Sequence, residues 1–401
     1  MLTVDLLGVT LRNPFVIGAG PYSCDTRIIS KNMDRIAGAG WGGVVLKSIT
    51  CNERLTHERC GARPHIFPVK GRDGLIGIQN WGPFFTYWRD IASLLTGVIE
   101  AGSERGVLII PSVIAETIND WVYLAGKMEE AGAAMVELDL SCPHSPEKVK
   151  KGEPAVTDLH PELVEEVVSS IRNRCGISII AKLGPNLYDL SKIARAAEKG
   201  GASAISAVNT VLGLSGIDIE TGIPLCVSGN NRGICSGLSG DLLRPIGLRC
   251  VAQIASSVKI PILGIGGVSS WESAVEYLMV GATALEVCTA VMLWGFNVVS
   301  RFLEGLTVFM DRQGYKSIED FRGKSLNYLA ADFSQLSREP LVATVDERCN
   351  GCGICVTACA DGSAGAITLK DGDARVDRSS CMGCGLCQTI CPVGAIRVLS
   401  P

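Results

Sequence analysis

Residues 178–210 read SIIAKLGPNLYDLSKIARAAEKGGASAISAVNT, and this stretch contains the unit from which the fold is built. Its two ends, 178–184 and 204–210, are short apolar runs with the composition of buried strands. Between them, residues 189–200 carry apolar side chains at the spacing of one helix face. The stretch therefore predicts a strand, a helix and a second strand.

The same unit repeats toward both ends of the chain. Further strands are predicted at 14–20, 42–48, 107–114, 135–141, 261–267 and 284–290. Helical patterns lie near 27–38, 84–101, 119–131, 161–174, 241–257, 270–279 and 297–312. Eight strands that alternate with eight helices predict an α/β fold of the (β/α)8 TIM-barrel type. An open doubly wound sheet is the alternative, but no G-x-G-x-x-G loop follows the first predicted strand.

We expect residues 1–325 to form the barrel, 326–340 a linker, and 341–401 a small α+β domain. Two segments of the barrel, 49–83 and 211–240, are too long for ordinary turns. Loops of that length in a compact domain usually serve function.

Composition excludes several classes of protein. The 401 residues are 47% hydrophobic and 19% charged, which suits a large core and argues against disorder. Thirty-seven Lys and Arg against 41 Asp and Glu form no basic stripe, so we expect no nucleic-acid partner. No apolar run has the length of a membrane helix, and the first residues do not resemble a secretory signal. We expect a cytoplasmic protein that binds no membrane and forms an oligomer.

The ends of the predicted strands carry polar and small residues. In a barrel these ends meet at one mouth, where active sites of this fold lie. The mouth residues predicted in this way are Ala19, Gly20, Lys47, Ser141, Cys142, Lys182, Asn209, Thr210, Gly266, Gly267, Cys288 and Thr289. Two lysines, a thiol and an amide at the same edge indicate a site rather than solvated side chains.

Eight of the 17 cysteines lie within residues 349–391, in two runs that repeat after 32 residues. Residues 349–359 read CNGCGICVTAC and residues 381–391 read CMGCGLCQTIC. This spacing is that of bacterial two-cluster ferredoxins, in which the fourth cysteine of each run ligates the other cluster. It predicts two [4Fe–4S] clusters, although four thiolates also suit zinc. The first cluster would take Cys349, Cys352, Cys355 and Cys391; the second would take Cys381, Cys384, Cys387 and Cys359.

The barrel residues resemble the dihydroorotate dehydrogenase superfamily of FMN-dependent barrels. The stretches that carry the resemblance are VVLKS, GIQNWG, LSCPH, AKLGPN, AVNTVLGL, GLSGDLLRP, ILGIGGV and LEVCTA. They cover nearly the whole barrel in the family's order. With the cysteine repeat, the chain is most similar to members that act on pyrimidines and carry an iron–sulfur tail. The resemblance implies an oxidoreductase that interconverts a 5,6-dihydropyrimidine-like ring and its unsaturated form.

The resemblance also implies which residues hold FMN. Lys47 and Lys182 suit the edge of the flavin that becomes negative on reduction, and Asn209 contacts the ring. Glycine turns after the last two strands suit the phosphate. The expected cofactor-binding residues are Ala19, Gly20, Lys47, Lys182, Asn209, Ser239, Gly240, Gly266, Gly267, Cys288 and Thr289.

Cys142 is the expected catalytic acid, because its thiol is protonated at neutral pH yet gives up its proton readily. The expected substrate-binding residues are Asn80, Asp139, Ser141, His144, Asn209 and Thr210. Asp139 departs from the asparagine that the family usually has there. An ionised carboxylate only accepts hydrogen bonds, so it suits ring N–H groups and opposes a ring carbonyl.

Electrons are expected to pass through the clusters to or from a partner. Because the chain has no nucleotide-binding fingerprint, we expect a separate FAD-containing subunit that oxidises NAD(P)H, or a soluble ferredoxin. Two alternatives remain open. The substrate is dihydroorotate or another conjugated enone or cyclic amide, or the barrel is non-catalytic and the chain only transfers electrons.

Overall fold

The computed structural model describes residues 2–20, 25–53, 56, 65–81, 85–141, 160–228 and 230–399. The chain divides into two compact units, Met1–Tyr328 and Leu329–Pro401. This division falls inside the segment 326–340 that we expected as a linker. None of the described helices has the length and apolar character needed to cross a bilayer.

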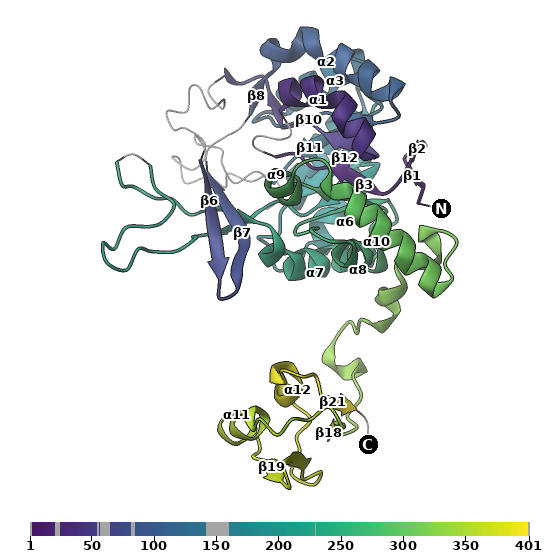
Figure 1. Cartoon of the computed structure of the whole chain (residues 1–401). Coiled ribbons are helices and arrows are strands. Elements are labelled where there is room, and N and C mark those ends of the chain that lie inside the picture. The colour runs from purple at the N-terminus through teal and green to yellow at the C-terminus, as the bar shows by residue number, and fades with distance from the viewer. Residues whose placement is uncertain are drawn as a thin grey trace. The chain divides into compact units, whose positions relative to one another are not determined.

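The first unit is a closed parallel barrel (Figure 1). Its strands are β3 (Phe15–Ile17), β4 (Gly43–Val45), β5 (Ile49–Thr50), β8 (Thr86–Tyr87), β9 (Leu108–Ile110), β10 (Ser112–Val113), β11 (Met135–Asp139), β12 (Ser178–Leu183), β13 (Ala204–Ala207), β16 (Ile262–Ile265) and β17 (Ala284–Val287), with β8 paired beside β5. β4 and β5 are two parts of one predicted strand, as are β9 and β10. Because β4 pairs with β9 while β5 pairs with β10, the two ends of the sheet order meet and the barrel closes. The barrel prediction is confirmed.

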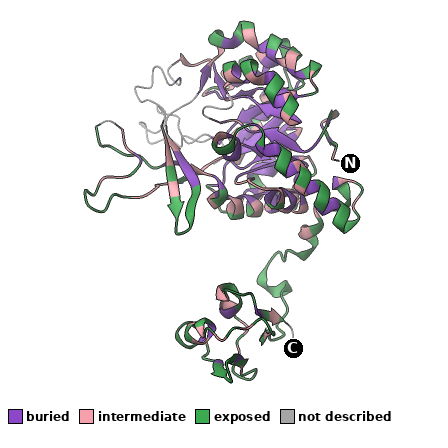
Figure 2. Ribbon diagram, in the orientation of Figure 1, coloured by how far each residue is buried: buried purple, intermediate pink, exposed green. Residues whose placement is uncertain are grey.

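Helices surround the barrel where the sequence predicts them. They are α1 (Thr26–Ala39), α2 (Trp88–Glu104), α3 (Ile118–Glu130), α5 (Pro161–Arg172), α6 (Ser191–Gly200), α7 (Arg244–Ala255), α8 (Trp271–Met279) and α10 (Val298–Gln313). Local chemistry explains their starts: Pro161 opens α5, where no N–H is needed, and Ser270 forms a capping box at α8. Figure 2 shows the result, a buried sheet covered by helices that are buried on one side.

The two long segments of the barrel differ from our expectation of loops. Parts of them pair into one antiparallel sheet of β14 (Val211–Gly213), β15 (Ser236–Ser239), β7 (Gly74–Trp81) and β6 (His65–Gly71), in that order. The buried Gln79 joins the two segments, because its Nε2 donates to Ser236 Oγ at 2.8 Å and its Oε1 accepts from the Ser215 N–H at 2.6 Å. The partners in the β7–β15 pair lie more than a hundred residues apart, so no local pattern predicts that the two segments join.

The last predicted strand is also shorter than expected. β17 ends at Val287, and Thr289 already begins the short helix α9 (Thr289–Trp294). The mouth therefore contains the start of a helix after this strand.

The second unit repeats a small motif around its cysteines. β18 (Val342–Val345) pairs with β21 (Ile396–Leu399), and β19 (Ile367–Lys370) pairs with β20 (Asp373–Val376). The helices α11 (Ile354–Gly362) and α12 (Leu386–Ile390) lie within the two cysteine runs. The core of this unit contains Cys355, Cys359 and Cys387.

Candidate active site

A cavity of about 270 Å³ opens at the mouth of the barrel. Most of the residues predicted for the site line it. They are Ala19, Gly20, Lys47, Asn80, Asp139, Lys182, Asn209, Thr210, Ser239, Gly240, Gly266, Gly267, Cys288 and Thr289. Cys142 and His144 lie outside the described residues, whereas Ser141 reaches the lining through hydrogen bonds. The strand-end rule therefore brings residues from seven strands to one cavity.

One side of the cavity is formed by glycines whose backbone conformation other residues rarely adopt. Gly240, Gly266 and Gly267 have φ of 99°, 121° and 78°, a backbone region that other residues rarely adopt. A Cβ atom at Gly267 would lie 2.8 Å from the carbonyl oxygen of Gly240, and one at Gly240 would lie 2.7 Å from Gly77 Cα. Beside them, Thr289 Oγ1 donates to Ser239 Oγ at 2.9 Å. Bare backbone and hydroxyl donors of this kind fit a phosphate group.

The two lysines of the cavity have different surroundings. Lys47 Nζ lies 5.4 Å from the ring centroid of Phe85, at the distance of a cation–π contact. Lys182 is only 4% exposed, and its Nζ lies 3.1 Å from Glu137 Oε1 and 3.6 Å from Glu286 Oε2. Burial lowers the pKa of Lys182, but the charges of Glu137, Glu286 and Asp139 outweigh burial and raise the pKa well above its ordinary value. Lys182 therefore stays a cation beside the cavity.

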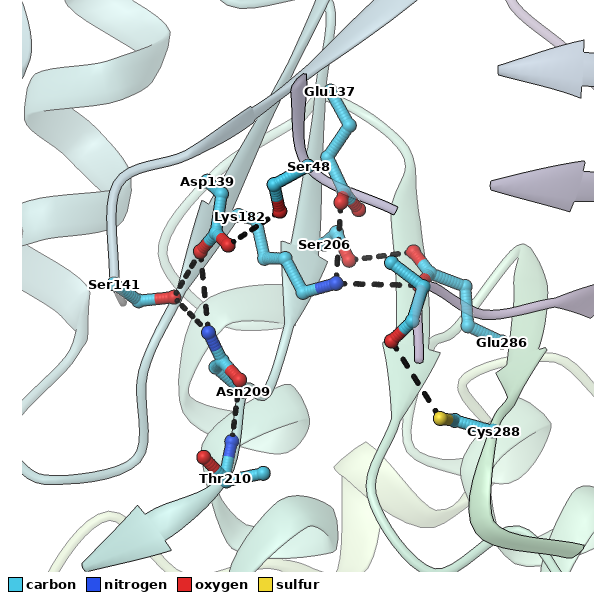
Figure 3. Close-up of polar contacts among 11 residues, drawn as sticks. Ser48, Glu137, Asp139, Ser141, Lys182, Ser206, Asn209, Thr210, Glu286 and Cys288 are labelled. Carbon is cyan, nitrogen blue, oxygen red and sulfur yellow. Dashed lines mark hydrogen bonds and ion pairs between the residues drawn. The ribbon is translucent and has the colours of Figure 1, made fainter. Parts of the chain in front are cut away.

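Asp139 is the centre of a hydrogen-bond network, shown in Figure 3. Its Oδ2 accepts from Ser48 Oγ at 2.9 Å, and its Oδ1 accepts from Ser141 Oγ at 3.4 Å and Asn209 Nδ2 at 3.2 Å. The same Asn209 Nδ2 donates to Ser141 Oγ at 3.0 Å, and Asn209 Oδ1 accepts from the Thr210 N–H at 2.7 Å. Both carboxylate oxygens of Asp139 therefore already accept hydrogen bonds from the protein. Asp139 fixes the orientation of the Asn209 amide.

Sequence reasoning missed the charged residues beneath the cavity. Glu137 and Glu286 are 0% and 1% exposed, and Ser206 lies with them inside the barrel. A signal exists in the sequence: each glutamate interrupts an otherwise apolar strand, MVELD or ALEV. A carboxylate in such a strand needs a buried partner. The apolar walls, which include Ile76, Ile78, Phe85, Met292 and Trp294, had no comparable signal.

In the second unit the eight predicted cysteines form two sets. One small cavity is lined by Cys349, Cys352, Cys355 and Cys391, and another by Cys359, Cys381, Cys384 and Cys387. This is the crossed grouping that the repeat predicts. The sulfurs also have hydrogen-bonding neighbours: the Ala395 N–H donates to Cys391 Sγ at 3.2 Å, and Ser363 Oγ lies 3.2 Å from Cys384 Sγ. Four thiols around a cavity fit an iron–sulfur cluster, whose potential such hydrogen bonds adjust.

The barrel site and the cysteine-lined cavities together define a redox protein, in which one unit offers a cofactor pocket and the other iron–sulfur sites. Comparison with known families agrees. Residues 1–310 match the family model of dihydroorotate dehydrogenase, and residues 343–398 match that of the 4Fe-4S dicluster domain. The chain belongs to the dihydroorotate dehydrogenase family, a family of flavin-dependent oxidoreductases, and it carries a 4Fe-4S domain.

Two relatives differ in how much of the chain they match. The NAD-dependent dihydropyrimidine dehydrogenase subunit PreA of Escherichia coli K12 is 32% identical over 380 residues, which cover 92% of this chain and 88% of the relative. The catalytic subunit of dihydroorotate dehydrogenase B (NAD(+)) of Pyrococcus abyssi is 35% identical over 329 residues, which cover 81% of this chain and 99% of the relative. The first relative therefore extends the match beyond the barrel.

Proposed function

We propose that this protein is an FMN-dependent oxidoreductase that interconverts a 5,6-dihydropyrimidine-like ring and its unsaturated form. The observation that carries the proposal is the cavity at the barrel mouth, which combines the glycine turns of Gly266 and Gly267, a buried cation and neutral hydrogen-bonding side chains. The match to the pyrimidine-acting relative over most of both chains supports the substrate class.

Each part of the cavity suits one part of this task. The glycine turns and Ser239 would hold the FMN phosphate, and Lys47 and Lys182 would stabilise the flavin edge that gains negative charge. When bound, FMN supplies the hydride chemistry. Asn80 and Thr210 would bind the amides and carbonyls of the ring, and Asp139 would hold Asn209 in place for the same purpose. Cys142, which follows directly on Ser141, would supply the proton to the ring carbon.

The second unit would carry electrons through two [4Fe–4S] clusters, each held by one of the two cysteine sets. We propose that the electrons are exchanged with an NAD(P)H-oxidising, FAD-containing partner subunit or with a soluble ferredoxin. The relative PreA, which is named as a subunit of an NAD-dependent enzyme, supports this arrangement.

A second candidate substrate is dihydroorotate. The similarity to the Pyrococcus catalytic subunit, 35% identical over 329 residues, favours it. Orotate differs from uracil by a carboxylate on the ring, so it needs a cation near the substrate. Among the described residues, Lys182 forms ion pairs with Glu137 and Glu286, whereas Lys47 forms none, so Lys47 is the cavity cation that suits such a carboxylate.

Cofactor content and half-reactions test the proposal together. Protein purified without oxygen is expected to contain one FMN and, from the ligand count, about eight irons per chain. After reduction with dithionite, the flavin is expected to be reoxidised by uracil or thymine in a stopped-flow experiment. Faster reoxidation by orotate would favour the second candidate. If no ring reoxidised a flavin that is present, the barrel would be non-catalytic or would act on another class of substrate.

The substitution Asp139→Asn distinguishes an effect of Asp139 on the flavin potential from an effect on the choice of ring. Because both oxygens of Asp139 accept from protein donors, we expect the loss of its charge to act on the flavin and not on ring selection. The midpoint potential of the flavin should rise, since a negative charge near Lys182 is removed. The ranking of uracil, thymine and orotate should stay unchanged. A changed ranking at constant potential would instead mean that Asp139 selects the ring, by direct contact or through Asn209.

A further inference from the structure

The interior of the barrel below the cavity contains two carboxylates and one ammonium group. Glu137 from β11, Lys182 from β12 and Glu286 from β17 are all at least nine-tenths buried, and Lys182 Nζ lies between the two carboxylates. Barrel interiors are usually filled by branched apolar side chains. A charged group there is stable only when it is paired and hydrogen-bonded.

The hydrogen bonds of this cluster are incomplete. Ser206 Oγ donates to Glu286 Oε1 at 2.6 Å, and Lys182 Nζ donates to Glu137 Oε1 at 3.1 Å. Among the described residues, Oε2 of Glu137 and Oε2 of Glu286 have no hydrogen-bond partner. One ammonium group cannot neutralise two buried carboxylates, so one carboxyl group keeps its proton. Burial and the nearby charge of Glu137 raise the pKa of Glu286 to about 8, against the opposing effects of Lys182 and Ser206.

The polar groups around Glu286 come from strands across the barrel interior, since β17 itself pairs with β16 and β3. β11 contributes Glu137 and Asp139, β12 contributes Lys182, and β13 contributes the neutral Ser206. On the side of β3, the nearest residue is Gly18, whose added Cβ would lie 3.3 Å from Glu286 Oε2. The other titratable groups of the cavity lining are Lys47, Asp241 and Cys288. The balance of charge at Glu286 is therefore set mainly by Glu137 and Lys182.

We propose that Glu286 holds a redox-linked proton: it binds a proton when negative charge appears in the cavity beside Lys182 and releases it when that charge is removed. This role rests on the proposed FMN, and it makes Glu286 a positioning residue that acts through Lys182. Glu286 lines the same cavity as Lys182, so a charge there is felt by both.

Above pH 8, the uptake of two electrons is coupled to the uptake of two protons. Reduction of the oxidised cofactor by two electrons adds one proton to its N5 and leaves a net negative charge on the ring. An ionised Glu286 then takes up a second proton from solvent, because three negative charges, those of Glu137, Glu286 and the ring, are unfavourable beside one ammonium group. Below pH 8, Glu286 is already protonated and only the N5 proton is taken up. Oxidation runs the same sequence in reverse.

Spectroelectrochemical titration of the full-length holoprotein tests this linkage. Above pH 8, each pH unit should shift the reduction equilibrium of the wild-type flavin by a further factor of ten. For a two-electron reduction, this lowers the midpoint potential by about a further 30 mV per pH unit. Glu286→Gln keeps the shape but cannot ionise, so it should lose this additional dependence and match the wild type near pH 7. Equal slopes in the two proteins above pH 8 would overturn the proposal.

Two neighbouring substitutions should move the onset of the linkage in opposite directions. Ser206→Ala removes the hydrogen bond to Glu286 Oε1 and should move the onset to higher pH, because that bond favours the ionised form. Glu137→Gln removes the like charge and should move it to lower pH. Shifts in the same direction for both substitutions would also contradict the role of Glu286.

A measurement without flavin separates this inference from the proposed function. In the full-length apoprotein, the infrared spectrum of the wild type minus that of Glu286→Gln should contain the C=O band of a protonated carboxylic acid at pH 7. The band should disappear as the pH rises through about 8. Its absence at pH 7 would overturn the inference even if FMN binds and turns over. If the band is present but the purified protein contains no FMN and binds none, the proposed function fails and the redox linkage fails with it.

Discussion

Cys142→Ala is expected to reduce the rate of ring reduction by about 10²- to 10⁴-fold, the usual cost of removing a positioned general acid. Cys142 follows Ser141 in the sequence, and the Ser141 hydroxyl donates to Asp139 at the end of β11. The variant should keep its FMN and irons, because the glycine turns, the lysines and the cysteine sets are unchanged. The flavin should still be reduced by dithionite at the normal rate.

The measurement is single-turnover reoxidation of the reduced flavin by uracil, which isolates the step that needs the proton. Cys142→Ser is a second probe: its hydroxyl has the shape of the thiol but is a much weaker acid, so it should be slow as well. Cys235→Ala, a substitution of an exposed cysteine, controls for the loss of a thiol elsewhere. Normal turnover by Cys142→Ala would mean that another group supplies the proton.

The sequence predicts the barrel well because each of its elements is local. A buried parallel strand such as 178–184 and an amphipathic helix such as 161–174 each carry their own pattern, and only one fold class arranges eight such pairs. The same rule predicts the cavity. Once the strand ends are known, Lys47, Lys182 and Asn209 must meet, although they lie far apart in the chain.

What the sequence does not predict depends on distant pairing. The sheet that joins β7 to β15 forms because Gln79 satisfies backbone groups near residues 213–236, and nothing in either segment specifies the other. The Glu137–Lys182–Glu286 cluster is a similar case. Each glutamate alone is an unusual residue in a strand, and only the closed barrel brings both to the same ammonium group. The acceptor role of Asp139 toward Ser48 likewise requires the segment between β4 and β5, which does not neighbour β11 in the sheet.

Lys182→Met is expected to lower the free energy of unfolding of the first unit by about 3–5 kcal/mol at neutral pH, because it leaves a buried carboxylate without its partner. Burial and the charge of Glu137 already hold the pKa of Glu286 at about 8, above its ordinary 4.5. An acid with a raised pKa in the folded state loses stability as pH rises through that window. Without the ammonium group the pKa of Glu286 should rise further, so stability should continue to fall at higher pH. The difference in free energy of unfolding between variant and wild type should therefore be smallest below pH 4.5 and grow as pH rises.

Urea unfolding followed by tryptophan fluorescence measures this difference in the full-length chain, since all six tryptophans lie between residues 41 and 294 and report only on the first unit. The double variant Lys182→Met with Glu137→Gln is the matched control. Positions 137, 182 and 286 then carry no charge at neutral pH, because Glu286 stays protonated there, so most of the lost stability should return. FMN affinity should not return, because the cation is still missing from the cavity. If the single variant were as stable as the wild type at pH 8, Glu137 would also be protonated in the folded protein, and Lys182 would be an ammonium group that serves the cofactor alone.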